Sequence, residues 1–167
     1  MALSDVIEPI VEDDHKIVIR PTEVADTRTC DHTKVTKAEL LEASKHHIAD
    51  VQRAMDFFSR LIQQAGEQHD HDKLTNIDEF FHDFQEGFVK PRWLENHHVV
   101  NRHHLNEPTG IPTDVNLIDV LEMIGDCVMA GMGRSGSVRS LEIDPDVLMQ
   151  AFKNTAEQLA RRVEVSE

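Results

Sequence analysis

Apolar residues recur at steps of three and four along the segment that follows residue 36. This spacing predicts an amphipathic helix over residues 37–65 that buries one apolar stripe and ends near Gly66. Thr36 and Glu39 have the spacing of a capping box, which would close the start of this helix. The apolar positions are Leu41, Ile48, Val51, Met55, Phe58, Ile62 and Ala65.

Four more helical segments follow. Thr75 resembles a helix N-cap, and apolar residues from Ile77 to Phe88 give the next short helix its apolar side. The segment that begins at Pro91 is expected to be helical up to the break at "NEPTGIP". A long helix should run from near Thr113 to about Met132, before the Gly/Ser loop "GMGRSGSVRS".

The last helix should begin at Asp144-Pro145, because proline is favoured at the first helical position, and its apolar positions reach Val163. Residues 1–35 form a mixed segment in which 17–19 (Ile-Val-Ile) predicts a strand or an extended arm. We therefore expect an all-α fold of about five helices over residues 36–167, with a short extended N-terminal arm over 1–35.

Length and charge narrow the classes of function. A chain of 167 residues fits one domain with a core. A net charge of −14 argues against duplex nucleic acid and anionic membranes as partners, since both require a basic face. The N-terminus has no signal-peptide pattern, and Cys30 and Cys127 form no CxxC pair, so a cytoplasmic location is expected. The sequence leaves open whether the chain forms a homo-oligomer.

Two His-Asp pairs follow one another in "EQHDHDKLTN". Only the first pair, His69-Asp70, has Lys73 at the offset of an HDxxK motif. Further histidines and an aspartate occur before and after this pair. With the pair included, their order along the chain is His47, His69-Asp70, His97, His103-His104, Asp126.

This order resembles that of the HD-domain superfamily of metal-dependent phosphohydrolases, which are all-α. Over about residues 40–136 the blocks "HHIADV", "HDHDKLTNIDEF", "HHVVNRHH" and "EMIGDCVMAG" are similar to those of a largely uncharacterised bacterial and phage HD-like family. The resemblance implies an HD-like bundle. It also implies metal ligation by His47, His69, Asp70, His97, His103, His104 and Asp126. This chain departs from the family pattern at Asp72 (serine), Cys127 (tryptophan) and Leu105 (aromatic).

Each assignment has an alternative. His47 borders the apolar stripe, whereas His46 faces polar residues. Asp126 lies on an apolar helix, where a carboxylate needs a cation or hydrogen-bond donors, and Glu122 one turn earlier either orients a ligating histidine or is exposed. His97, His103 and His104 either hold a second metal or, beside one metal, bind phosphate or act as acid and base.

Four cationic side chains are candidates for binding phosphate: Lys73, Arg102, Arg134 and Arg139. The G-x-G-x-x-G pattern at 131–136 follows a helix rather than a strand, so we reject a dinucleotide site.

Mixed imidazole and carboxylate ligands suit Mn, Fe, Co, Ni or Zn, with one or two ions per chain. The expected function is a metal-dependent phosphohydrolase that acts on a small phosphorylated molecule, with a nucleotide favoured and Asp70 and Lys73 as the catalytic pair. The alternatives are a non-catalytic protein that binds metal or senses a ligand, and the di-iron oxygenase chemistry that a minority of HD-fold proteins resemble.

Overall fold

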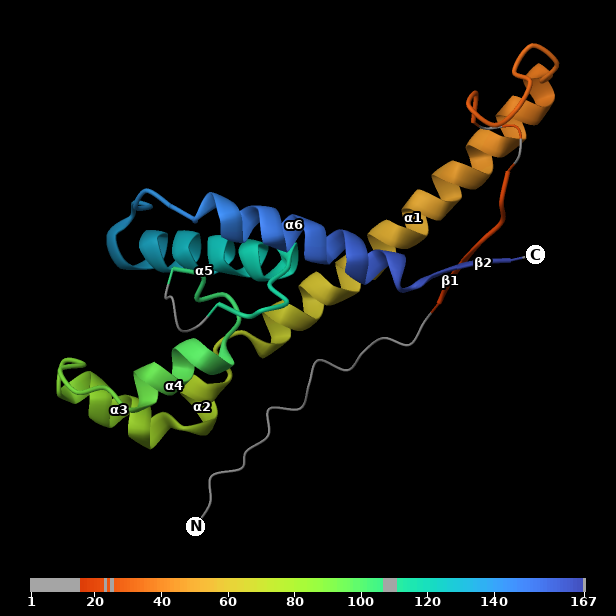
Figure 1. Ribbon diagram of the computed structural model, residues 1–167. Helices are drawn as coiled ribbons and strands as arrows, with labels where there is room; N and C mark the ends of the chain where they lie inside the picture. The colour runs from red at the N-terminus through yellow and green to blue at the C-terminus, as the bar shows by residue number, and fades with distance from the viewer. Residues whose placement is uncertain (1–15, 23, 25, 107–110, 167) are drawn as a thin grey trace. The chain divides into compact units, whose positions relative to one another are not determined.

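The predicted all-α fold is confirmed. A computed structural model describes residues 16–22, 24, 26–106 and 111–166 (Figure 1). Over these residues the chain forms five helices of eight residues or more, a single-turn helix and two short strands. The elements are β1 (Ile17–Ile19), α1 (Lys37–Gln68), α2 (Asp72–Thr75), α3 (Ile77–Gln85), α4 (Trp93–Val100), α5 (Leu117–Ser135), α6 (Pro145–Ala160) and β2 (Val163–Val165).

The described chain divides into two compact units. The helical unit comprises residues 61–156, and therefore holds the end of α1, all of α2 to α5 and most of α6. The strand unit comprises residues 16–60 and 157–166, apart from positions 23 and 25. The expected boundary between an arm and a domain at residue 35 stays a prediction, and residues 1–15 of that arm lie outside the described residues.

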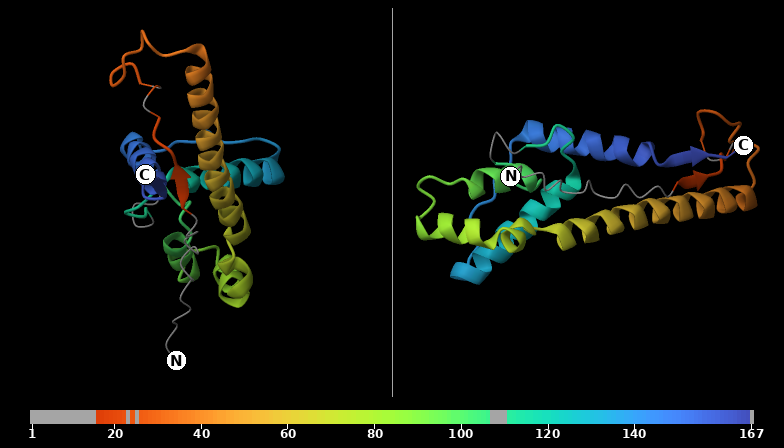
Figure 2. Two further views of the ribbon diagram at one scale, coloured as in Figure 1. Left: turned by 90° about the vertical axis from the view of Figure 1, so that its right-hand side faces the viewer. Right: turned by 90° about the horizontal axis from the view of Figure 1, so that it is seen from below.

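In the strand unit, β1 and β2 pair in parallel, with Ile17 opposite Val163 and Ile19 opposite Val165 (Figure 2). The predicted strand at 17–19 is confirmed. The placement of Val163 on the last helix is wrong, because that helix ends at Ala160 and Val163 begins β2. A guanidinium N–H of Arg53 on α1 donates to the carbonyl of Val18 over 3.0 Å, which joins β1 to the helix.

In the helical unit, the core lies between α5, α6 and the loop that follows α4. Its buried residues are Leu105, Val115, Val120, Met123 and Ala151. Thr155 on α6 accepts a hydrogen bond from the backbone N–H of Leu117 over 2.8 Å, and this contact ties α6 to the first turn of α5. Leu105 directly follows the His103-His104 pair. Because this leucine is buried in the core, it fixes the position of the backbone that carries the two histidines.

Helix boundaries follow the local capping chemistry. The Thr36–Glu39 capping box is present, with Thr36 N–H donating to Glu39 over 2.8 Å, and α1 continues past Gly66 to Gln68. Helix α5 was predicted to begin near Thr113 but begins at Leu117. The reason is that the Asn116 side chain caps it by accepting hydrogen bonds from the backbone amides of Ile118 and Asp119.

Three further boundaries were also predicted. Thr75 ends α2 and does not cap α3, which begins at Ile77. The predicted start at Pro145 is confirmed, with Asp144 accepting from the Asp146 amide over 2.8 Å. The prediction that the segment from Pro91 is helical up to "NEPTGIP" is wrong, because α4 begins at Trp93 and ends at Val100. Residues 107–110 of "NEPTGIP" lie outside the described residues.

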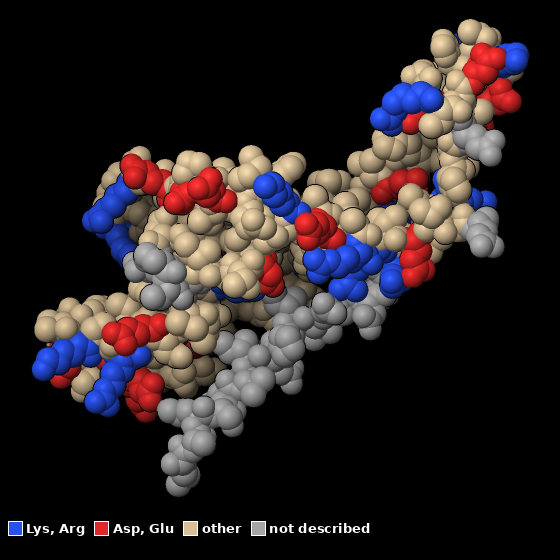
Figure 3. All heavy atoms as spheres, viewed as in Figure 1, with Lys and Arg blue, Asp and Glu red and all other residues tan. Residues whose placement is uncertain are grey.

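On the face seen in Figure 3, acidic and basic side chains are interspersed among uncharged ones. Within the described residues, no helix combines the length and the apolar character that crossing a membrane requires.

Candidate metal centre

The turn between α1 and α2 presents His69 and Asp70 side by side. Asp70 has a φ of 52°, in the left-handed region that aspartate enters more readily than most residues. Helix α2 then restarts at once, with the Lys73 amide donating to the Asp70 carbonyl over 2.9 Å. Helix α1 thus ends just before the turn that contains Asp70, and the Asp70 carboxylate faces His97 of α4 and His103 of the loop after it.

Helix α4 is positioned by the buried carboxylate of Asp83, which is 4% exposed. One oxygen of Asp83 accepts from the backbone amides of Arg92, Trp93 and Leu94 over 3.0, 2.9 and 3.3 Å. A negative charge at this end of a helix also complements the helix dipole. The Trp93 ring stacks on His97 at 4.5 Å, so the cap of α4 sets the orientation of its histidine.

The loop after α4 carries His103 and His104 and is fixed at its start. Asn101 donates its backbone N–H to the His97 carbonyl over 3.0 Å. Arg102 makes two hydrogen bonds to the buried carboxylate of Asp119 on α5, over 2.8 and 2.9 Å. This pair joins the loop to α5, the helix that also carries Glu122 and Asp126.

One group that can hold a metal ion consists of His69, Asp70 and His103, whose ligand atoms all lie within 4.8 Å of one another. Nε2 of His69 lies 3.4 Å from one oxygen of Asp70, and Nε2 of His103 lies 3.6 Å from the other. Two ligand atoms on one ion, each at about 2.0–2.2 Å, are at most about 4.4 Å apart. These separations therefore suit a shared ion.

A single oxygen of Glu122 contacts the outer nitrogens of both histidines in this group. Oε1 lies 2.9 Å from Nδ1 of His69 and 2.8 Å from Nδ1 of His103. With the proton on Nδ1, each imidazole directs the lone pair of Nε2 toward Asp70. Such a carboxylate behind a ligating histidine fixes both its tautomer and its orientation.

A second group that can hold a metal ion consists of Asp70, His97 and His104, again with ligand atoms within 4.8 Å of one another. Nε2 of His97 lies 3.4 Å from Oδ1 of Asp70. On the far side of the ring, Nδ1 lies 2.8 Å from an oxygen of Asp72. Asn101 donates to the other oxygen of Asp72 over 2.9 Å, so a carboxylate and an amide together hold this histidine.

The two groups share Asp70, and their inward-facing atoms include buried ones with no hydrogen-bond partner among the described residues. Among them are Oδ1 of Asp70 and Nε2 of both His103 and His104. Nδ1 of His103, although 2.8 Å from Glu122, also has no hydrogen bond of good geometry. Leaving a buried polar atom unpaired costs about 1–3 kcal/mol. Three such atoms beside one another are what a set of metal ligands presents before an ion is added, and nitrogen with carboxylate oxygen is the donor set of a transition metal.

Asp126 borders the first group. Its Oδ1 lies 3.8 Å from Nε2 of His69, and its side chain is 32% exposed. The carboxylates of Asp70 and Asp126 thus both face the same imidazole. The sequence prediction placed residues 69, 70 and 126 in one neighbourhood, and the structure brings them together.

Burial and charge compete at Asp70 and its neighbours. Burial acts to raise the pKa of Asp70, but the hydrogen bond and the positive charge of Lys73 outweigh it and lower the pKa. Burial likewise acts to raise the pKa of Glu122, but the contacts with His103 and His69 outweigh burial, so the pKa of Glu122 is lowered. Both carboxylates therefore remain charged at neutral pH and attract a cation.

Buried His97 and His103 and half-buried His104 differ in charge preference. Burial lowers the pKa of His97 despite the opposing effect of Asp72. Burial, with smaller contributions from the neighbouring histidines, lowers the pKa of His104 to about 3. At His103 the contact with Glu122 overcomes burial and raises the pKa. Since only neutral imidazole ligates a metal, His97 and His104 are in the ligating form at pH 7.

His47 is in neither group. It is exposed near the start of α1, whereas His69 directly follows the last residue of this unbroken helix, Gln68. An α-helix rises 1.5 Å per residue, so most of the length of α1 separates the two histidines along the chain. The structure does not bring His47 to the centre, and its role as a ligand stays a prediction. His46 is also exposed.

The four candidate phosphate-binding cations have different surroundings. Lys73 pairs closely with Asp70 and is the one that lies at the centre. Arg102 is engaged by Asp119 and also contacts Asp114 over 3.0 Å, so the structure gives it the task of joining the loop to α5. Arg134 and Arg139 are exposed, at the end of α5 and in the following loop.

Sequence reasoning missed three supporting residues. It took Asp72, which replaces the serine of the resembled motif, only as a neighbour of the His69-Asp70 pair that adds negative charge beside the site. Asn101 lies four residues after His97, which is the spacing of neighbours on one helix face. The sequence did not indicate the capping role of Asp83, because its hydrogen-bond partners are backbone amides nine to eleven residues further along the chain.

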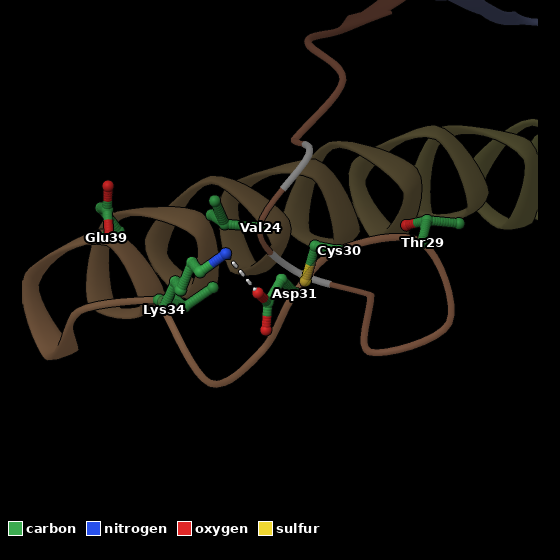
Figure 4. Close-up of a pocket in the computed structure, with 7 residues that line it drawn as sticks. Val24, Thr29, Cys30, Asp31, Lys34 and Glu39 are labelled. Carbon is green, nitrogen blue, oxygen red and sulfur yellow. Dashed lines mark ion pairs between the residues drawn. The ribbon is translucent and has the colours of Figure 1, made fainter.

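The strand unit contains a separate open pocket of about 560 Å³ in the segment before α1 (Figure 4). Asp31 there forms an ion pair with Lys34 over 2.8 Å, and the nearby Cys30 is half-buried. The lining residues are Val24, Thr29, Cys30, Asp31, Lys34, Val35 and Glu39. None of the predicted site residues is among them.

Comparison with known proteins gave no match, either among family models, among curated proteins or among solved structures.

Proposed function

We propose that this protein is a metal-dependent phosphohydrolase of the HD type that acts on a small phosphorylated molecule, with a nucleotide as the favoured class. The observation that carries the proposal is the sharing of Asp70 between two histidine-containing groups. A carboxylate between two sets of imidazoles can bridge a pair of cations, which is an arrangement used in hydrolysis of phosphate esters.

In this proposal His69, Asp70 and His103 hold one ion, with Asp126 beside it, and Asp70, His97 and His104 hold a second. Nitrogen-rich ligand sets favour Mn, Fe, Co, Ni or Zn over calcium. When bound, the ions would lower the pKa of a water molecule toward neutrality and polarise a phosphoryl oxygen.

The chain's own residues have distinct tasks. Asp70 joins the two groups, and Lys73 places an ammonium beside it, where it can pair with an oxygen of the phosphoryl group. Glu122 and Asp72 hold three of the imidazoles by their outer nitrogens. Lys73 is the only predicted phosphate-binding cation at the centre itself, which favours a small substrate over a polyanion.

The competing hypothesis is a non-catalytic protein in which the same residues hold metal for stability or for sensing a ligand. A structural site has no free coordination position, whereas a catalytic site keeps one open. Asp126, which is 32% exposed beside the first group, places this side of the centre near solvent and so favours access for a substrate.

The test is to load the purified protein with each of the five metals and measure metal content and hydrolysis together. Nucleoside monophosphates, triphosphates and cyclic nucleotides are the substrate panel, with released phosphate and product nucleotide as readouts. Bound metal with hydrolysis of one class supports the proposal. Bound metal without hydrolysis of any compound favours the non-catalytic alternative, and two irons with oxygen uptake would indicate an oxygenase.

Variants separate catalysis from structural metal binding. Asp70→Asn, which tolerates the left-handed φ of this position, should abolish hydrolysis, and an unchanged melting temperature of the metal-free protein would locate the loss in catalysis. His71→Ala is the matched control, because His71 is an adjacent but exposed histidine outside both groups. It should keep full activity.

A further inference from the structure

Helix α1 carries an apolar stripe with a seven-residue repeat. One row of the stripe recurs at every seventh position, and a second row lies three residues after each member of the first. The first row is Leu41, Ile48, Met55 and Ile62, and the second row is Ser44, Val51, Phe58 and Ala65. These are the a and d positions of a heptad, continued over more than three repeats.

A seven-residue period has a specific physical meaning. A straight α-helix has 3.6 residues per turn, so positions seven apart drift by about 20° per repeat. Over the three and a half repeats of this stripe the drift totals about 70°, so a second helix that winds slightly around α1 can stay in contact with the whole stripe.

The prediction that this stripe is buried is wrong in the strand unit, where most of its large side chains are exposed. Leu41, Ile48 and Met55 are 53%, 57% and 59% exposed, and Val51 is 46% exposed. Each is a large apolar side chain, and exposing several in one row is costly. The stripe is thus an apolar surface that extends along α1.

Within the strand unit, another face of α1 is buried. Ala43 and Phe57 are buried, at 4% and 1% exposure, and they occupy the c position of the same heptads. The contact between Arg53 and the Val18 carbonyl also lies outside the a and d rows. Inside this unit, therefore, α1 buries one face against its own chain and leaves the heptad face uncovered.

Charge on α1 is arranged around the stripe. Its acidic residues all occupy the outer b, c and f positions, and none lies in the two rows or at the e and g positions beside them. They are Glu39, Glu42, Asp50, Asp56 and Glu67. In a chain of net charge −14, this leaves a seam along which a second copy meets no acidic residue.

We propose that a second copy of this chain covers the stripe, with α1 packed on α1 as a coiled coil. The stripe is complementary to itself, because the knobs of one copy and the holes of the other come from the same rows. Its length, the acid-free flanks and the seven-residue period all fit this occupant. The proposal does not depend on the proposed activity.

Sedimentation velocity of the full-length protein over a wide range of concentrations tests the proposal. The wild-type chain should form a dimer or a higher self-assembly. The double variant Ile48→Glu/Met55→Glu should raise the dissociation constant by about a hundredfold or more, because it places two charges inside the seam. Far-UV circular dichroism should show unchanged helix content.

The control is His46→Glu, which adds the same charge at an exposed f position of α1 and should leave assembly unchanged. If the double glutamate variant does not fold, Ile48→Ala/Met55→Ala shortens the same side chains with a good helix former and should still weaken assembly. A wild-type chain that stays monomeric throughout, or assembly that persists in folded double variants, overturns the proposal and assigns the stripe to another partner.

Discussion

The carboxylate of Asp72 lies 2.8 Å from Nδ1 of His97, and Nε2 of the same ring lies 3.4 Å from Asp70. His97 is therefore held from behind by one carboxylate and faces another. The serine found at this position in the resembled motif would carry no charge. An aspartate here adds a negative charge behind the ring and makes its inner nitrogen a stronger ligand.

Asp72→Ala should weaken metal binding by about 10- to 100-fold, the usual cost of removing a residue that orients a ligating histidine. Titration calorimetry with Mn or Zn measures the loss. Asp72→Asn keeps a hydrogen-bond acceptor without the charge, and should fall between the wild-type protein and the alanine variant. Affinity unchanged in both variants would contradict the assigned role of Asp72.

The sharing of Asp70 predicts a specific pattern of metal stoichiometry. His69→Ala and His97→Ala should each remove one ion, because each histidine belongs to one group only. Asp70→Ala should remove both ions. Elemental analysis of the dialysed proteins gives the counts, and a single ion lost from Asp70→Ala would contradict a bridging carboxylate.

Asp83→Ala should reduce the free energy of unfolding by about 1–3 kcal/mol, since it removes the acceptor of three backbone amides at the start of α4. Urea denaturation measures the change. Asp78→Ala, an exposed aspartate in the first turn of α3, is the control and should change stability far less. Equal effects in the two variants would show that the cap of α4 is energetically unimportant.

Arg102→Ala should destabilise the protein by about 3–5 kcal/mol, because Asp119 would be left buried and charged without its partner. Replacing Asp119 by asparagine in the same chain should recover part of the loss. If Arg102→Ala instead keeps full stability and raises only the KM for substrate, the phosphate-binding role expected from sequence would be correct.

The pH dependence of the metal-free protein should include a contribution from His104. Its folded pKa of about 3 lies below the ordinary value of 6.5, so below that pH the unfolded chain binds a proton that the folded chain does not. Stability is therefore expected to fall as pH decreases from about 6.5 toward 3. Melting temperatures between pH 7.5 and 5.5 should show a smaller decline in His104→Gln.

His103 acts in the opposite direction, because its raised pKa makes protonation favour the folded state. Its contribution is complete below the ordinary pKa and disappears as pH rises through the folded value. The difference between His104→Gln and the wild-type protein isolates the first effect. A decline that is equally steep in both proteins would contradict the assignment to His104.

The helical elements could be read from sequence wherever capping chemistry and periodicity are local. The Thr36–Glu39 box and the Asp144-Pro145 start each depend on residues within one turn, and the structure has both. The pairing of β1 with β2 could not be read, because it joins residues more than a hundred positions apart and each strand has only three residues.

The sequence by itself determined the kinds of candidate ligand, their order along the chain and most of the helices that carry them. Only the tertiary structure decided which of them meet. It joined His69, Asp70, His97, His103 and His104, placed Glu122 and Asp72 behind the rings, and engaged Arg102 with Asp119. The physical reason is that capping and amphipathic periodicity act within a few turns, whereas these contacts depend on how the turn at Asp70 and the burial of Leu105 bring distant segments together.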